Sequence, residues 1–204
     1  MTLNPVTVEM PQGFLLLDVG FPDGLDDNAD ALDAEVLTLE DTWAVAVTYQ
    51  DVDHAGCLAA VAGRTDAVVF AHQRDTPYLE GEKKLVKSSV RCPMEIAPTA
   101  VDVRVTGGET FATASGPMRA VYTPGHSPGH TSYYFPDAAL LISADALKVV
   151  DELVGPREDA TPDLEAAWES VEELATLDIE TTFRFHGEFV EAGTDRIEEL
   201  LADW

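Results

Sequence analysis

The sequence predicts a domain that mixes strands and helices, of the α+β or α/β class. Eight short apolar runs, rich in β-branched and aromatic residues, indicate strands and dominate the middle of the chain. Four stretches with helical periodicity lie in both halves of the chain. A length of 204 residues, 46% of them hydrophobic, is enough for one domain with a sizeable core.

Each expected element is short and bounded by turn or capping residues. The expected strands cover 14–19, 44–48, 67–71, 101–105, 118–123, 132–135, 140–143 and 181–185. The expected helices cover 25–37, 55–62, 162–177 and 194–202. The third helical pattern is the clearest, because Thr161 suits the N-cap, Pro162 suits the first helical position, and apolar residues recur along one stripe.

The charge balance is strongly acidic, with 38 Asp and Glu against 12 Lys and Arg and a formal net charge of -26. Self-repulsion of this size is costly at low ionic strength. In molar salt the Debye length falls to about 3 Å and the repulsion is screened. We therefore expect a halophilic protein of the haloarchaeal type. In such salt, net charge alone does not exclude a polyanionic substrate.

No segment of the chain resembles a membrane span or a secretory leader. The longest apolar runs, at 14–20 and 138–144, are far too short to cross a bilayer. Two cysteines, Cys57 and Cys92, form no disulfide framework. We expect a cytoplasmic protein without a membrane partner.

Histidine and aspartate residues follow several of the expected strands. His54 follows "AVAVTYQDVD", His126 lies in "VYTPGHSPGH", Asp145 follows "ALLIS" and His186 ends "TTFRFH". Loops at strand ends can bring such side chains to one point. Any one of them alone is more often a loop cap or a satisfied buried histidine, but four together indicate a site.

Five segments, taken in order and spacing, resemble the metallo-β-lactamase superfamily. They are "LLLDVG" at 15–20, "TYQDVDHAG" at 48–56, "YTPGHSPGHT" at 122–131, "LISADAL" at 141–147 and "FHG" at 185–187. The resemblance implies an α+β fold, a four-layer αβ/βα sandwich of two mixed sheets flanked by helices. It implies a single domain over residues 1–204, with metal ligands on loops at one edge of the sandwich.

The resemblance also implies two metal positions that share Asp145 as a bridging carboxylate. One position would be held by Asp53, His54, Asp145 and His186. The other would use His126, Asp145 and the first two histidines of the family's H-x-H-x-D-H loop. We therefore expect one or two divalent metal ions, zinc first, with iron or manganese as alternatives.

The loop at 48–56 departs from that pattern, because Tyr49 and Asp51 stand at the positions of the first two histidines. In an extended strand end Tyr49, Asp51 and Asp53 would project to the same side, so Asp51 can still reach a metal ion. We count Asp51 among the candidate ligands, although an aspartate at this place in so acidic a chain can also be coincidental. A neutral phenol binds metal poorly, so Tyr49 is expected to contact a metal-bound water or the substrate.

Three further residues receive roles from the same reasoning. Asp53 is the candidate catalytic residue, since it could orient the attacking water. His130, one turn beyond His126, is expected to hydrogen-bond a ligand rather than to bind metal. Lys148 is a candidate contact for an anionic substrate group. The basic segment 81–91, with Lys83, Lys84, Lys87 and Arg91, could contact such a group or an acidic patch of a partner subunit, but it is interpreted as a solvated helix face.

A metal ion that activates water would make the chain a hydrolase. The expected substrate is a small ester, thioester or lactone, as in the glyoxalase II and lactonase branches that the chain resembles. Two alternatives stay open: a phosphodiesterase or nuclease, and a metal-depleted or mononuclear binding or regulatory protein, which the Tyr49 and Asp51 replacements favour. We expect a small-molecule partner and no nucleic acid, with a homodimer as an open alternative for the assembly.

Overall fold

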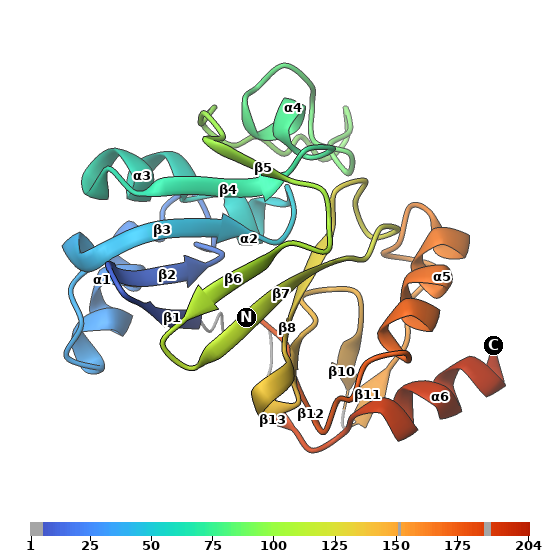
Figure 1. Ribbon diagram of the computed structural model, residues 1–204. Coiled ribbons are helices and arrows are strands. Elements are labelled where there is room, and N and C mark those ends of the chain that lie inside the picture. Colours follow the sequence, from blue (N-terminus) through green and yellow to red (C-terminus); the bar gives the residue numbers. More distant parts are fainter. Residues whose placement is uncertain (1–5, 151, 186–188) are drawn as a thin grey trace. The chain divides into compact units, whose positions relative to one another are not determined.

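The computed structural model describes residues 6–150, 152–185 and 189–204 (Figure 1). The chain divides into two compact units, an N-terminal unit that ends at Val105 and a C-terminal unit that begins at Thr106. Each unit contains one mixed sheet with helices. The expected α+β class and its two mixed sheets are thereby confirmed, whereas the single domain over 1–204 stays a prediction.

The N-terminal unit is built on a five-stranded sheet in which the strands follow one another in chain order. Its strands are β1 (Val6–Met10), β2 (Gly13–Leu17), β3 (Thr42–Val47), β4 (Val68–His72) and β5 (Val103–Val105). The β1–β2 pair is antiparallel and the other pairs are parallel. The central strands β2 and β3 are almost wholly apolar, as is typical of strands that are buried on both faces.

Short helices connect the strands of this unit. They are α1 (Leu25–Ala34), the 3-10 helix η1 (Leu39–Asp41), α2 (Val52–Ala55), α3 (Leu58–Thr65) and α4 (Thr76–Leu79). Leu32 of α1 and Leu58 and Val61 of α3 form one core with Leu16 and Val45 of the sheet. The core therefore fixes the ends of β2 and β3, from which the candidate site residues of this unit extend.

The C-terminal unit contains a six-stranded sheet in the order β13-β12-β9-β8-β7-β6. Its strands are β6 (Thr110–Thr113), β7 (Gly116–Tyr122), β8 (Thr131–Phe135), β9 (Leu140–Ile142), β12 (Thr181–Phe183) and β13 (Phe189–Val190). The β9–β12 pair is parallel and the other pairs are antiparallel. A separate hairpin joins β10 (Lys148–Val150) and β11 (Glu152–Val154).

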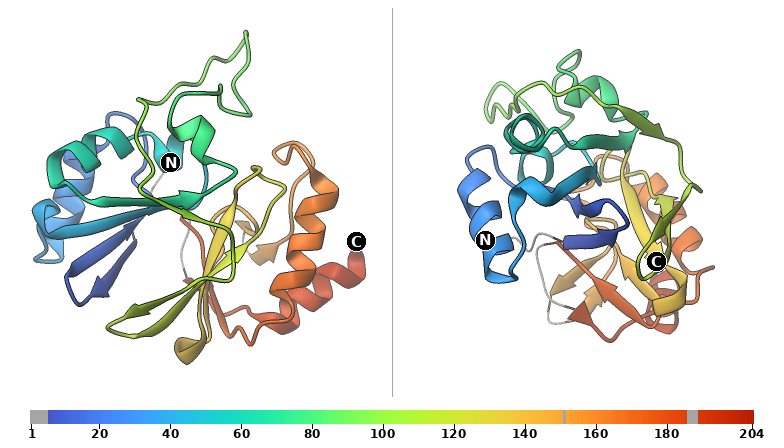
Figure 2. Two further views of the ribbon diagram at one scale, coloured as in Figure 1. Left: turned by 45° about the horizontal axis from the view of Figure 1, so that its top comes forward. Right: turned by 60° about the vertical axis from the view of Figure 1, so that its left-hand side comes forward.

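Two helices, α5 (Leu164–Leu174) and α6 (Thr194–Asp203), pack side by side in this unit (Figures 1 and 2). A short 3-10 helix, η2 (Pro136–Ala138), joins β8 to β9. Val171 and Leu174 of α5 and Ile197 of α6 share a core with Val121 and Leu141 of the sheet. Trp168 and Trp204 stack with ring centroids 4.8 Å apart, which ties the end of α6 to α5.

All eight expected strands and all four helical regions are present, with shifted ends. The helix expected at 55–62 is two helices, α2 and α3, because the chain turns at Gly56 and Cys57. Asp163, rather than Thr161, caps α5, since its side chain accepts a hydrogen bond from the Ala166 N–H. The segment 81–91 forms turns and bends, so the expectation that it is a solvated helix face was wrong.

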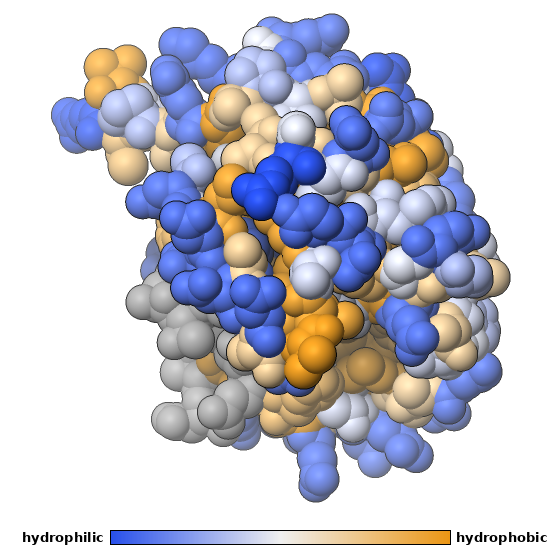
Figure 3. Space-filling model, turned by 90° about the vertical axis from the view of Figure 1, so that its left-hand side faces the viewer, coloured by the Kyte–Doolittle hydropathy of each residue, from blue (hydrophilic) through white to orange (hydrophobic). Residues whose placement is uncertain are grey.

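The surface agrees with the composition. Hydrophilic residues cover much of the face shown in Figure 3, interrupted by smaller apolar areas. In the part of the chain that the structure describes, no helix has the length and apolar character needed to cross a membrane.

Candidate functional site

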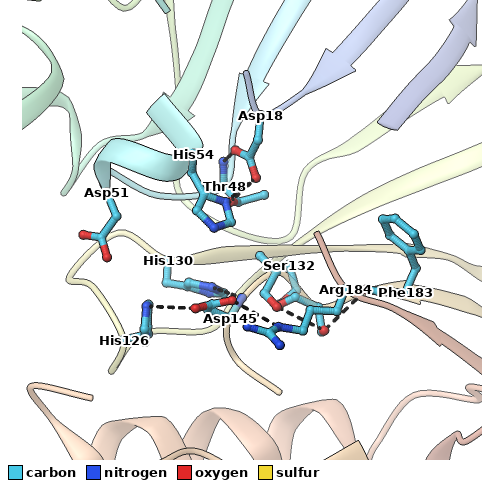
Figure 4. A network of polar contacts seen from close by, with 12 residues as sticks. Asp18, Thr48, Asp51, His54, His126, His130, Ser132, Asp145, Phe183 and Arg184 are labelled. Atoms are coloured by element: carbon cyan, nitrogen blue, oxygen red, sulfur yellow. Dashed lines mark hydrogen bonds and ion pairs between the residues drawn. The ribbon is translucent and has the colours of Figure 1, made fainter. Parts of the chain in front are cut away.

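A buried polar triad of Asp18, Thr48 and His54 lies where β2 and β3 end in the N-terminal unit (Figure 4). The two Asp18 carboxylate oxygens accept hydrogen bonds from the Thr48 N–H and the Thr48 hydroxyl, each at 2.7 Å. The same carboxylate lies 2.7 Å from His54 Nδ1. Because a carboxylate only accepts, Nδ1 carries the proton and Nε2 keeps the electron pair that a metal ion would bind.

Local backbone structure places His54 at this carboxylate. The Asp51 carbonyl accepts hydrogen bonds from the N–H groups of His54 and Ala55, which closes the single turn of α2. The His54 carbonyl in turn accepts from the Val19 N–H at 2.8 Å. Asp18 has a positive φ of 58°, a conformation that aspartate tolerates better than most residues. The turn after β2 and the turn of α2 are thus joined by both backbone and side chains.

Asp53 and Asp51 are positioned differently from the expectation. Asp53 lies within helix α2 and is half-buried. The expectation that Tyr49, Asp51 and Asp53 project to the same side of an extended strand was therefore wrong for Asp53. Asp51 is extended and 8% exposed, and its carboxylate pairs with Lys87 Nζ at 2.7 Å. Burial raises the pKa of Asp51, and the neighbouring Lys87 ammonium opposes that rise.

Tyr49 is almost completely buried beside this ion pair. Its ring centroid lies 4.1 Å from that of His54, and Lys87 Nζ lies 5.7 Å from the centre of the Tyr49 ring. The aromatic ring thus lies close to His54 of the triad and to Lys87 of the ion pair. The sequence points to Lys87 only as one of the basic residues of segment 81–91, and nothing in the local pattern indicates its contact with Asp51.

In the C-terminal unit, both ring nitrogens of His130 are engaged. His130 Nε2 accepts a hydrogen bond from the Asp145 N–H at 3.1 Å, so Nδ1 is the protonated nitrogen. Nδ1 donates to the Thr123 hydroxyl at 2.9 Å, and that hydroxyl contacts the Ser132 hydroxyl at 2.9 Å. His130 therefore holds the turn that carries Asp145. Both of its ring nitrogens already form hydrogen bonds within the protein.

His126 and Asp145 approach each other in the same unit (Figure 4). His126 Nε2 lies 3.4 Å from one oxygen of Asp145, and Arg184 Nε lies 3.5 Å from the other. Arg184, which follows β12, was not expected at the site, although it stands in the "FRFHG" segment. Lys148 begins β10 and is 9% exposed.

The loop that carries His126 is anchored to α5. The Ser170 hydroxyl donates to the Pro124 carbonyl at 2.7 Å, and the Asp163 N–H donates to the Gly125 carbonyl at 3.2 Å. Gly125 has a φ of +126°, and a Cβ there would meet Ala167 Cα at 2.5 Å. Only glycine allows the backbone at 125 to come this close to α5, so the "PGH" turn fixes the backbone position of His126.

The donor chemistry fits one metal position better than the other. The fixed Nε2 of His54 suits a metal ion, whereas Asp51 already holds a cation from its own unit. Among the residues that the structure describes, no three His, Cys, Asp or Glu side chains gather closely enough to hold a metal ion. His186, the remaining expected ligand, lies outside the described residues.

Comparisons with known proteins identify the family to which the chain belongs. The family model of the metallo-beta-lactamase superfamily matches residues 7–186. The probable metallo-hydrolase YflN of Bacillus subtilis is 27% identical over 87% of this chain and 76% of that protein. The probable metallo-hydrolase YqgX of the same organism is 33% identical over 51% of this chain. The matched region covers about half of YqgX, 49%.

More distant relatives and solved structures give the same result. A hydroxyacylglutathione hydrolase of Maricaulis maris is 27% identical over 88% of this chain and 63% of that protein. A metallo-beta-lactamase family protein of Thermus thermophilus has the same fold, with a TM-score of 0.79 at 22% identity over 98% of this chain and 74% of that one. The chain therefore belongs to the metallo-β-lactamase superfamily and is a metallo-hydrolase.

Proposed function

We propose that this metallo-hydrolase cleaves a small ester, thioester or lactone with an activated water. The observation that carries the proposal is the buried Asp18–His54 pair, which fixes the tautomer of a histidine at 0% exposure. Proteins commonly orient a metal-binding histidine by such a carboxylate. The same contact fixes the direction in which Nε2 of His54 points.

The donors proposed for the metal ion are Asp53, His54, Asp145 and His186. A divalent ion, when bound, polarises the substrate carbonyl and lowers the pKa of a water molecule to about 7. His54 presents Nε2 because Asp18 holds the proton on Nδ1. Asp53, one residue before His54 in α2, is the proposed acceptor that orients the attacking water.

The substrate class rests on the relatives. Several relatives bear the name hydroxyacylglutathione hydrolase, and an acyl group on glutathione is a thioester. Zinc is the first choice of ion, and iron or manganese are alternatives where oxygen donors predominate. The acidic composition supports a halophilic protein. The proposed location is the cytoplasm, and the proposed substrate is a small molecule.

The test is a reconstitution experiment in molar KCl. The metal-free protein is loaded with Zn, Mn or Fe(II) and assayed with a short-chain acyl thioester, an aryl ester, a γ-lactone and a phosphodiester. We expect metal-dependent hydrolysis of at least one carbonyl substrate, lost in His54→Gln. His72→Gln is the matched control, because His72 is also a buried histidine of the N-terminal unit but lies outside the proposed donors.

Each alternative predicts a different outcome of this experiment. Turnover of the phosphodiester alone would favour a phosphodiesterase. A metal-loaded protein that hydrolyses none of the four substrates would favour a binding or regulatory protein. That second alternative is supported by the Lys87–Asp51 pair, because Asp51 stands where the resemblance implies a metal-binding histidine and is already paired with a side-chain cation.

A further inference from the structure

The variant loop contains a built-in cation. Lys87 Nζ lies 2.7 Å from Asp51 Oδ2 and 5.7 Å from the centre of the Tyr49 ring. These are the two residues that replace the first two histidines of the family's metal-binding loop. A carboxylate and an aromatic face both attract a positive charge, so the replacements suit an ammonium group better than they suit a metal ion.

The position of Lys87 is held by a buried network rather than by chance packing of a long side chain. Gln50 donates through its N–H and its amide nitrogen to the two oxygens of Asp75, at 3.0 and 2.9 Å. The Gln50 side-chain oxygen then accepts from the Val86 N–H at 2.8 Å. Gln50 and Asp75 are 0% and 1% exposed, and Leu85 anchors the same segment in the interior.

The network joins the two partners of the ion pair. Gln50 directly precedes Asp51, and Val86 directly precedes Lys87. One glutamine side chain therefore sets the distance between the backbones that carry the carboxylate and the ammonium. The Lys87 side chain is 22% exposed and that of Asp51 is 11% exposed, so the pair lies largely out of solvent.

A metal ion would compete poorly for this carboxylate. A divalent cation on Asp51 would repel the Lys87 ammonium at short range in a poorly solvated place. Removal of Lys87, in contrast, would leave the buried carboxylate without the cation that offsets its desolvation. The donor set thus disagrees with a second metal ion as long as Lys87 is present.

We propose that the Lys87 ammonium replaces the family's metal ion beside Asp51, so that the chain binds one metal ion and Lys87 binds a substrate oxygen anion. The second half of the proposal rests on the proposed hydrolase function. Asp51 and Tyr49 act as positioning residues for the ammonium. The role of Lys87 is electrostatic, since a fixed positive charge stabilises an oxyanion as a metal ion would.

The first test counts metal ions and needs no substrate. Wild type, Lys87→Met and Lys84→Met are saturated with Zn or Mn, freed of excess metal by gel filtration, and measured by elemental analysis. We expect one ion per chain in wild type and in Lys84→Met, which removes an exposed lysine of the same segment. We expect a second, weaker ion in Lys87→Met, because Asp51 is then released.

Two results would overturn the replacement of a metal ion by Lys87. One is a wild-type protein that binds two ions per chain. The other is Lys87→Met that still binds only one under saturating metal. Circular dichroism and the urea midpoint show that each variant is folded before it is counted.

The second test measures turnover at one equivalent of metal. Lys87→Met is expected to lose about 100-fold in kcat on the best carbonyl substrate, as for removal of an oxyanion donor, and Lys87→Arg to recover part of the loss. Unchanged kcat in Lys87→Met would refute the role of Lys87 at the substrate. If wild type hydrolyses no substrate but binds one ion, the proposed function fails and the metal count still decides the replacement.

Discussion

Asp18 Oδ2 lies 2.7 Å from His54 Nδ1, and neither side chain exposes more than 2% of its surface. The two residues are 36 positions apart, so the contact joins the turn after β2 to helix α2. Thr48, at the end of β3, completes the same network. One carboxylate therefore fixes both the backbone of two strand ends and the tautomer of the candidate metal-binding histidine.

The first prediction concerns Asp18→Asn. Asparagine tolerates the positive φ of this position and its oxygen can still accept from the Thr48 N–H, but its amide nitrogen cannot accept the hydrogen bond that His54 Nδ1 donates. We expect the free energy of unfolding to fall by about 1–3 kcal/mol. Metal affinity should fall about 10–100-fold, as measured by titration with a chromogenic chelator.

Asp66→Asn is the matched control for this change. Asp66 also has a positive φ, 55°, at the C-cap of α3, but it is exposed. Its substitution should alter stability by less than about 0.5 kcal/mol and leave metal affinity unchanged. Equal losses in the two variants would show that the effect of Asp18→Asn comes from the backbone conformation and not from His54.

The sequence predicted the central part of each sheet because those strands are continuous apolar runs. The strands that escaped prediction are short or polar, as in β1 with "VTVEM" and β6 with "TFAT". Such segments become strands by pairing with a neighbour, and no local pattern marks that pairing. For the same reason the short helix α4, "TPYL", could not be distinguished from a turn.

The sequence indicates candidate site residues where they follow a strand, and it does not indicate partners that come from elsewhere in the chain. His54 and Asp145 follow strands at which apolar runs end, so they could be found. Asp18 contacts His54, Lys87 contacts Asp51 and Arg184 lies near Asp145 only through tertiary structure. Long basic side chains carry no local signal of their direction. The His186 assignment stays a prediction.

The second prediction compares two glycines. Gly125→Ala places a Cβ against Ala167 of α5 at a φ of +126°, so we expect a loss of about 2–4 kcal/mol in stability. Gly63 lies in α3 with nothing within 4 Å of an added Cβ, so Gly63→Ala should stabilise the protein by about 0.5–1 kcal/mol. Urea unfolding measures both changes. A neutral Gly125→Ala would mean that the loop before His126 moves away from α5 at little cost.

The third prediction concerns the two thiols. Burial is the main cause that raises the pKa of Cys57, with Asp23 adding to it and a backbone hydrogen bond from Gly24 opposing it. Less thiolate is then present at a given pH, and access is restricted as well. Iodoacetamide at about pH 8 should therefore modify exposed Cys92 in the native protein and leave Cys57 intact.

The same shift of Cys57 has a consequence for stability. Because its pKa is higher in the folded state, the folded protein favours the neutral thiol. That contribution is fully present below the unfolded-state pKa and is lost as the pH rises through the folded-state value. Cys57→Ala should abolish this alkaline dependence of the urea midpoint, whereas Cys92→Ser should keep it. Rapid alkylation of Cys57 in the folded protein would contradict both statements.

The last prediction concerns salt. The net charge of -26 destabilises the folded chain through self-repulsion. Salt at about 1 M screens this repulsion, because the Debye length is then roughly 3 Å. Exposed ion pairs such as Arg64–Glu40 weaken in the same salt, but each contributes only about 0–1 kcal/mol. The urea midpoint should therefore rise continuously from low salt to molar KCl.

Neutralising variants separate this repulsion from general effects of salt on hydrophobic burial. Asp30 and Asp33 are exposed in the last part of α1, where the helix dipole also disfavours acids, so Asp30→Asn with Asp33→Asn should raise the midpoint at low salt. Asp26→Asn with Asp27→Asn removes the same charge from the first turn, where the dipole favours acids. If repulsion dominates, both pairs raise the midpoint at low salt, the first pair more because the dipole adds to its gain, and both gains fade in molar KCl. A midpoint that is independent of salt in wild type would show that the acidic surface serves solubility alone.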